Sequence, residues 1–307
     1  MMKCSKCKRD SAVFLPYSKN NLCKKHFLEL FEKRFLRTVR EFNMLKKGDK
    51  VALGLSGGKD STTLLHLLSM LQKKLPFELF AITIDIGTKC GYNKKILEIS
   101  KRECKKLGVP HYIFTFKKEL GFTIDGIVKR TNTENPCSFC GVFRRRILNK
   151  KARELGANKL AIGHNLDDTA QTVILNLMRN EPLRLLRFHE PLITNKLLIP
   201  RIKPLTRTPE DEVVAYGKLK GLKLEAKRCC PYSKYAMRKA VRKMLDELED
   251  EYPGTKFKIF SSFLSIVNKL RECTDKKSMK INICKNCKEP SSTEFCMYCK
   301  LFGKVKK

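Results

Sequence analysis

The sequence predicts an α/β fold with a parallel, doubly wound sheet and a small cysteine-rich knuckle at each end of the chain. Through the middle of the chain, short apolar runs alternate with amphipathic helical patterns, which is the order of elements that builds a parallel sheet. A glycine-rich turn joins the first run to the first helix. Closely spaced cysteine pairs occur near both termini, and such pairs are typical of small metal-stabilised units.

Length and charge narrow the classes of protein that this chain can belong to. Its 307 residues suffice for one sizeable α/β domain with small appendages. Its 65 Lys and Arg residues outnumber its 31 Asp and Glu residues by 34, which favours a polyanionic partner, nucleic acid before an anionic membrane surface. Because no apolar run reaches spanning length and no signal peptide is visible, we expect a soluble, cytoplasmic protein without a membrane partner. In that reducing compartment, 14 cysteines favour metal ligands over disulfides.

Residues 1–27 carry the first metal pattern, with one pair at Cys4 and Cys7 and another at Cys23 and His26. Two tight pairs separated by a short polar loop are typical of a tetrahedral zinc site, and scattered free cysteines are the alternative. A unit with almost no core of its own needs the metal to be stable. We therefore predict an N-terminal zinc finger with a structural role, since a four-ligand site leaves no position open for catalysis.

A basic linker helix is predicted over residues 28–48. Apolar residues recur at helical spacing from Phe27 to about Met44. The opposite face is either solvated or contacts phosphate groups, and both interpretations stay open. Its basic residues are Lys33, Arg34, Arg37 and Arg40.

The glycine-rich turn lies between a predicted buried strand at 51–56 and a predicted helix at 61–74. This arrangement presents backbone N–H groups and a positive dipole end to a phosphate, and a side chain on either glycine would hold the anion away. Two common phosphate loops are excluded. A Walker loop ending at Lys59 requires glycine at position 53 and Ser or Thr at position 60, and the G-x-G-x-x-G spacing is absent. The candidate residues are Ser56, Gly57, Gly58, Lys59, Asp60 and Ser61.

Three further strands complete the predicted sheet, at 78–85, 111–116 and 159–163. Helices near 93–107 and 141–155, and one after His164, alternate with them in a domain over residues 49–205. Ligands of doubly wound sheets bind beyond the carboxyl ends of the strands. We therefore expect pocket positions at Ser56, Asp85, Phe116 and Gly163.

A second strand-to-helix turn occurs at residues 161–171. Asp167 and Asp168 fall in the first turn of the predicted helix, where the helix dipole favours negative charge. A carboxylate here could hold Mg²⁺ against pyrophosphate oxygens, and Asp60 is the other candidate ligand. Helix capping is the alternative role for His164 and both aspartates, and the two roles are compatible.

A cysteine pair, Cys137 and Cys140, precedes the helix predicted at 141–155 and should face the same pocket. A lone C-x-x-C fits zinc, a redox disulfide or an iron–sulfur cluster. Two more cysteines, Cys229 and Cys230, lie far downstream. Three thiolates on a 4Fe-4S cluster leave one iron without a protein ligand, and that open position can hold sulfide. Unrelated buried thiols are the alternative.

The last third of the chain is predicted to be mostly helical. In a region over 206–272, one helix starts with Thr208 as its cap, and others follow at 235–248 and 255–272. Basic residues between Lys234 and Lys243 suit RNA phosphates. Residues 273–307 are predicted to form the second zinc finger, of all-cysteine type. Its ligands are Cys284, Cys287, Cys296 and Cys299.

Residues 56–61 resemble the PP-loop of ATP pyrophosphatases, which split ATP between the α- and β-phosphates and adenylate a carbonyl oxygen. Residues 163–171 resemble the G-H-N-x-x-D stretch of tRNA-modifying PP-loop enzymes. Together with the cysteines, the chain is similar over nearly its whole length to the tRNA 2-thiouridine synthetases of the TtcA/TtuA group, in the form with a zinc knuckle at each end. The resemblance implies an adenine nucleotide alpha-hydrolase-like fold.

The same resemblance implies residue roles. Cluster ligands would be Cys137, Cys140 and Cys230, with Cys229 as a rival for the third position. Asp60 and these three cysteines would be the catalytic residues. Arg144 stands where some relatives carry lysine, and it can clamp a phosphate in a bidentate manner. The implied nucleotide contacts are Ser56, Gly57, Gly58, Lys59, Asp60, Ser61, Ile84 beside the adenine, Arg144, Gly163 and Asp167.

The resemblance implies an ATP-dependent tRNA uridine 2-sulfurtransferase that uses ATP, Mg²⁺, a 4Fe-4S cluster and two Zn²⁺ and releases AMP and pyrophosphate. Its partners would be tRNA, a second copy of the chain, and a sulfur donor that is either sulfide or a thiocarboxylated ubiquitin-like protein. The target is a wobble or a T-loop uridine, and a cysteine persulfide is an alternative to the cluster. Two other functions stay open: a PP-loop ligase for lysidine or amide formation, and a non-catalytic zinc-finger tRNA-binding protein.

Overall fold

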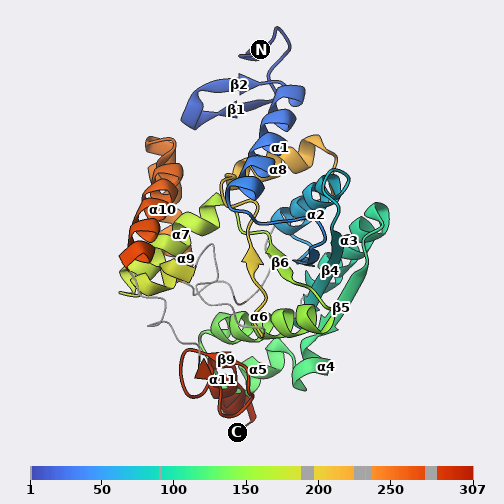
Figure 1. Cartoon of the computed structure of the whole chain (residues 1–307), viewed down its shortest axis with the longest axis vertical. Helices are drawn as coiled ribbons and strands as arrows, with labels where there is room; N and C mark the ends of the chain where they lie inside the picture. The colour runs from blue at the N-terminus through green and yellow to red at the C-terminus, as the bar shows by residue number, and fades with distance from the viewer. Residues whose placement is uncertain are drawn as a thin grey trace.

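The computed structural model describes residues 2–89, 92–187, 197–224, 232, 237–273 and 282–306. Figure 1 shows an elongated molecule with the central sheet between an N-terminal knuckle at one end and a C-terminal knuckle at the other. Within these residues, no helix combines the length and the apolar composition that crossing a bilayer requires.

The central sheet confirms the predicted fold class. Its strands are β3 (Lys50–Gly54), β4 (Glu78–Asp85), β5 (His111–Thr115), β6 (Lys159–Ile162) and β7 (Arg201–Ile202). They lie in the order β5-β4-β3-β6-β7, and every pair is parallel. The strand order reverses between β3 and β6, and the crevice at such a switch point is where doubly wound sheets bind their ligands. The short β7 was not predicted from the sequence.

Both faces of the sheet are buried, as the continuous apolar strands require. Alternate residues of each strand point to opposite faces. Val51 and Leu53 pack on the face covered by α1 (Lys24–Glu41), α2 (Lys59–Gln72), α3 (Tyr92–Leu107) and α8 (Glu210–Leu219). Ala52 packs on the other face, against α6 (Pro136–Glu154).

Two predictions about the carboxyl edge of the sheet were wrong. Phe116 is not a pocket position, because β5 ends at Thr115 and Phe116 is fully buried at the start of α4 (Phe116–Leu120), which precedes α5 (Ile124–Thr131). The cysteine pair does not precede its helix. Proline is favoured in the first helical turn, and Pro136 starts α6 there, so Cys137 and Cys140 belong to the helix.

The N-terminal unit consists of β1 (Val13–Leu15), η1 (Pro16–Ser18) and β2 (Asn20–Leu22), followed by α1. The predicted linker helix is therefore present, but it begins four residues before the predicted range of 28–48 and ends at Glu41. Phe27, Phe31 and Phe35 of α1 are fully buried, and the ring of Phe31 stacks on Tyr216 of α8 at a centroid distance of 4.1 Å. This contact attaches the N-terminal unit to the sheet domain.

The C-terminal helices pack around α7 (Leu166–Met178), which follows β6 and leads to η2 (Pro182–Arg187). Both α9 (Met237–Glu251) and α10 (Thr255–Cys273) contact α7. The cap of α8 differs from the prediction: Pro209 is the N-cap residue, and the backbone N–H of Glu210 donates to Asp167 of α7 instead. The chain ends with β8 (Asn282–Ile283), β9 (Pro290–Ser291) and α11 (Met297–Lys306).

Candidate active site

The glycine-rich turn lies at the N-terminus of α2, and contacts between its first and last residues hold its two ends together. Gly57 has φ +67°, and a Cβ there would lie 2.6 Å from the carbonyl oxygen of Ile96, so only glycine fits. The hydroxyl of Ser61 accepts from the backbone N–H of Ser56 and lies 3.0 Å from the Ser56 hydroxyl. Gly58 is the N-cap residue and supplies no side-chain cap, which leaves N–H groups of the first turn for an anion.

Lys59 is held between two carboxylates. Its ammonium lies 2.8 Å from Asp60 and 2.6 Å from Glu210 at the start of α8. Burial lowers the pKa of Lys59, but the two carboxylates outweigh burial and raise it, so the side chain stays charged. Glu210 in turn binds Arg242 of α9 at 2.7 Å. The loop lysine is therefore tied to the C-terminal helices.

The second turn lies directly against the first. A Cβ on Gly163 would lie 2.9 Å from the backbone nitrogen of Ser61, so a larger residue would push the two turns apart. Asn165 donates to Asp60 at 2.9 Å and also caps α7 in a capping box with Asp168. The helix-capping role expected for this segment is therefore present, carried by Asn165 and Asp168.

Asp167 lies within the protein and contacts two other helices. It is buried, one carboxylate oxygen lies 2.5 Å from the ammonium of Lys256, and the other accepts from the N–H of Glu210 at 2.7 Å. These contacts join α7, α8 and α10 beside the loop. Its predicted contact with the nucleotide or Mg²⁺ stays a prediction, as do those of Asp60 and Ile84. Ile84 lies in β4 and is partly buried.

The cysteine pair at the start of α6 meets the distant segment that the sequence paired with it. The thiol of Cys137 donates to the carbonyl oxygen of Tyr232 at 3.1 Å, and the Tyr232 hydroxyl donates to Asp125 of α5 at 2.7 Å. Cys229 and Cys230 lie outside the described residues, but only Pro231 separates Cys230 from Tyr232 in the chain.

Two four-ligand groups have the geometry of zinc sites. Cys7 and Cys23 are 3.8 Å apart in one, and in the other Cys284–Cys299 and Cys287–Cys296 are 3.8 and 3.6 Å apart. Zinc–sulfur bonds of about 2.3 Å at a tetrahedral angle place sulfurs about 3.8 Å apart. Each group therefore fits a metal. The complete sets are Cys4, Cys7, Cys23 and His26, and Cys284, Cys287, Cys296 and Cys299.

The C-terminal knuckle is fixed to the helix that carries the cysteine pair. Glu289 of the knuckle binds Arg146 at 2.6 Å and Arg153 at 2.5 Å, both on α6. The ring of Phe143, also on α6, contacts Tyr298 of α11 at a centroid distance of 5.4 Å. These contacts join α6 to the C-terminal unit. Arg144 is exposed on α6, one turn beyond Cys140.

Sequence reasoning missed three residues of this site. Glu210, Asn165 and Lys256 each bind a residue of a predicted motif through a side chain. Asn165 was detectable, because asparagine before an acidic first turn is a strong capping signal. Nothing in the local pattern around Glu210 or Lys256 indicates a partner that lies more than 80 residues away.

Comparison with known proteins identifies the family. A family model described as PP-loop domain matches residues 27–248. Over 302 residues, covering 98% of this chain and 94% of the relative, the sequence is 36% identical to tRNA-5-methyluridine(54) 2-sulfurtransferase of Pyrococcus horikoshii. The chain belongs to the PP-loop tRNA 2-thiouridine synthetases. A further model, for the N-terminal LIM domain of the 2-thiouridine synthetase TtuA, matches residues 3–28.

Two other synthetases of this family resemble the chain over its whole length. The tRNA 2-thiolation protein NcsA of Haloferax volcanii is 35% identical over 321 residues, with 99% of each chain covered. The structure of the U34-tRNA thiolase NcsA from Methanococcus maripaludis with its [4Fe-4S] cluster superposes with a TM-score of 0.84 at 37% identity, covering 99% of this chain and 96% of that one. These similarities confirm the family and fold predicted from the sequence.

Proposed function

We propose that this protein is an ATP-dependent tRNA uridine 2-sulfurtransferase that replaces O2 of a uridine by sulfur delivered through a 4Fe-4S cluster. The contact between Cys137 and Tyr232 carries the proposal, because it brings Tyr232, which follows Cys230 by two positions in the chain, to the cysteine pair across 95 residues. The PP-loop follows β3 at the switch point of the sheet. A nucleotide site and candidate cluster cysteines in one chain fit activation followed by sulfur transfer, whereas lysidine or amide formation needs no sulfur.

In the activation step, the uracil O2 attacks the α-phosphorus of ATP, and pyrophosphate leaves. The N-terminus of α2 and Lys59 bind the phosphates, with Arg144 as a further cation. Mg²⁺, held by Asp60 or Asp167, would neutralise the pyrophosphate oxygens. In the described structure Lys59 is held by Asp60 and Glu210, so we infer that phosphate oxygens replace at least one of these carboxylates when ATP binds.

In the second step, sulfur adds to C2 of the adenylated base and AMP leaves. Activation is needed because the oxygen of a urea-like carbonyl is a poor leaving group and AMP is a good one. When bound on Cys137, Cys140 and Cys230, the cluster would supply one iron without a protein ligand, where sulfide can be held. The α6 residues bind and orient that group, and Cys229 stays the rival third ligand.

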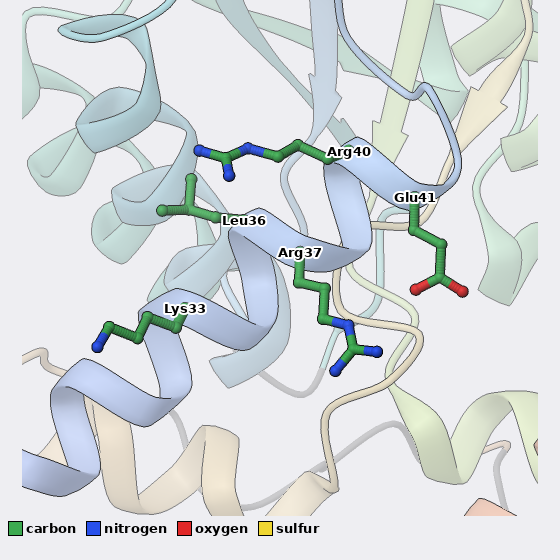
Figure 2. A pocket seen from close by; sticks show the side chains of 5 residues that line it. All are labelled: Lys33, Leu36, Arg37, Arg40 and Glu41. Carbon is green, nitrogen blue, oxygen red and sulfur yellow. The ribbon is translucent and has the colours of Figure 1, made fainter.

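The basic surface fits the tRNA partner. Figure 2 shows a shallow pocket on α1 in which Arg40 and Lys33 extend along one side, while Glu41 points away from Arg40. Among the described residues, Lys33, Arg37 and Arg40 have no carboxylate within ion-pair distance, whereas Glu41 binds Arg207. These exposed cations lie on the face of α1 opposite its buried face. Because none of the described carboxylates pairs with them, they fit contacts with RNA phosphates better than a role in surface salt bridges.

We further propose zinc in both knuckles, a homodimer, and sulfide or a thiocarboxylated ubiquitin-like protein as the sulfur donor. The ligand distances support zinc. The relatives include enzymes named for position 54 and for U34, at nearly equal identity, so the proposal specifies a tRNA uridine and leaves its position to be measured.

The test is thiolation of unmodified tRNA by the anaerobically purified protein with ATP, Mg²⁺ and sulfide, followed by mass spectrometry of nucleosides and position mapping. We expect 2-thiouridine, AMP and pyrophosphate in equal amounts. Cys137→Ala should abolish thiolation, while Cys104→Ala, which removes a buried thiol far from the pair, should retain it. Full thiolation by Cys137→Ala would exclude the cluster role. tRNA binding without AMP release would support a non-catalytic protein instead.

A further inference from the structure

The carboxylate of Asp60 is held by Asn165, which lies in the turn after β6. The side-chain amide of Asn165 donates to Asp60 Oδ1 at 2.9 Å. The other carboxylate oxygen, Oδ2, lies 2.8 Å from the ammonium of Lys59. Because the Asp60 side chain is only 13% exposed, these two donors determine its orientation more than water does. Asp60 is therefore held on one oxygen by a distant segment of the chain and on the other by its neighbour.

A second hydrogen bond fixes the orientation of the Asn165 amide. Its side-chain oxygen accepts from the backbone N–H of Asp168 at 2.9 Å, as the N-cap of α7. Since only the oxygen of an asparagine side chain can accept an N–H, the amide nitrogen must face Asp60. Asn165 is 1% exposed, and its backbone carbonyl oxygen accepts from the hydroxyl of Thr169. The donor to Asp60 is thus preorganised and shielded from water.

Helix capping alone does not explain why residue 165 is an asparagine. Serine and aspartate cap helices about as well as asparagine does. A serine hydroxyl would lie one bond closer to the backbone than the Asn165 amide nitrogen, and an ionised aspartate has no donor and would place a second carboxylate beside Asp60. The cap of α7 is therefore compatible with three residue types, whereas the hydrogen bond to Asp60 selects asparagine among them.

We propose that Asn165 is a positioning residue that orients the carboxylate of Asp60 for Mg²⁺. The amide keeps Oδ1, so Oδ2 stays beside Lys59, which the proposed function assigns to the phosphates of ATP. Without Asn165, the carboxylate can turn both oxygens toward the Lys59 ammonium, which then competes with the metal. Carboxylates that bind metals are themselves held by hydrogen bonds, and loss of such a bond costs about 10–100-fold in metal affinity. The inference rests on the proposed function through the role of Asp60.

The experiment measures ATP binding by calorimetry, once with Mg²⁺ and once with EDTA, for the wild-type protein and for Asn165→Ser. Serine keeps a cap on α7 and removes the donor to Asp60. We expect Asn165→Ser to weaken binding of ATP in Mg²⁺ by about tenfold or more and to leave binding in EDTA unchanged. Asp60→Ala should lose the same Mg²⁺-dependent affinity. The double variant should bind no more weakly than Asp60→Ala, because Asn165 acts through that carboxylate.

Asn158 provides the matched control, because it makes the same pair of bonds at the opposite edge of the sheet. Its side-chain oxygen accepts from the N–H of Lys50, the first residue of β3, at 2.9 Å, and its amide donates to Asp49 at 3.0 Å. Asn158→Ser therefore removes an asparagine–aspartate hydrogen bond at the edge away from the PP-loop. Its affinity for ATP should equal that of the wild-type protein both in Mg²⁺ and in EDTA.

Three results would overturn the role of Asn165. Equal losses of ATP affinity in Mg²⁺ and in EDTA would mean that Asn165 contacts the nucleotide or supports the fold. Unchanged affinity in both conditions would mean that its bond to Asp60 has no part in binding. Additive losses in the double variant would exclude action through Asp60. Failure of the proposed function would appear differently, as absence of 2-thiouridine with the wild-type protein while Mg²⁺ still strengthens ATP binding.

Discussion

Replacement of Lys256 by methionine should destabilise the protein strongly. The Lys256 ammonium lies 2.5 Å from Asp167 and 2.6 Å from Asp246, and burial, which alone would lower its pKa, is outweighed by these carboxylates. Methionine would leave the buried Asp167 carboxylate with only one donor, the N–H of Glu210. Breaking a buried pair from one side costs about 3–5 kcal/mol. For a chain of 307 residues that corresponds to a fall in melting temperature of roughly 5–8 °C.

Asp246 provides the matched control, because it binds the same ammonium from the surface. Its side chain is 42% exposed, compared with 7% for Asp167. Asp246→Asn should therefore cost at most about 1 kcal/mol. The double variant Lys256→Met/Asp167→Asn removes both buried charges and should regain part of the stability. Thermal unfolding monitored by circular dichroism measures all three. Equal, small effects of Lys256→Met and Asp246→Asn would refute the view that Asp167 is a buried connection between helices.

Two further predictions concern the loop and the C-terminal knuckle. Gly163→Ala should weaken ATP binding at least tenfold in calorimetry, because its Cβ would meet the Ser61 backbone, while Gly303→Ala, with no atom near its Cβ, should change nothing. Cys287→Ser should halve the zinc content and increase hydrogen exchange in α6, unless the knuckle holds its fold without metal.

The motifs were predictable from the sequence because their signals are local. An apolar run, two glycines and an acidic helix start identify the PP-loop, and its structure agrees at Gly57 and Ser61. The four sheet strands and their helices were recognised from apolar periodicity for the same reason. Errors occurred where local signals are weak. The strand β7 has only two residues, and α6 begins at Pro136, so that it includes the two cysteines predicted to precede it.

The missed part of the site consists of contacts between distant segments. Lys59 and Glu210 are 151 positions apart, and Asp167 and Lys256 are 89 apart. The first turn of α8 is acidic, and the helix dipole alone is enough to favour acidic residues there. The sequence of this turn therefore does not reveal that Glu210 binds Lys59 of the loop. Only the packing of α8 between α1 and α2 brings Glu210 to the loop.

These distant contacts suggest how nucleotide binding and RNA binding are connected. Lys59 binds Glu210, Glu210 binds Arg242, and Arg242 lies 3.4 Å from Asp246, which also binds Lys256. Phosphates that draw Lys59 away would leave Glu210 paired with Arg242 alone and would change the charge balance on α9. Because α9 carries the basic residues proposed to contact RNA, ATP and tRNA should alter each other's affinity by the same factor. Glu210→Gln, which weakens both ion pairs, should reduce that factor toward one in paired calorimetric titrations.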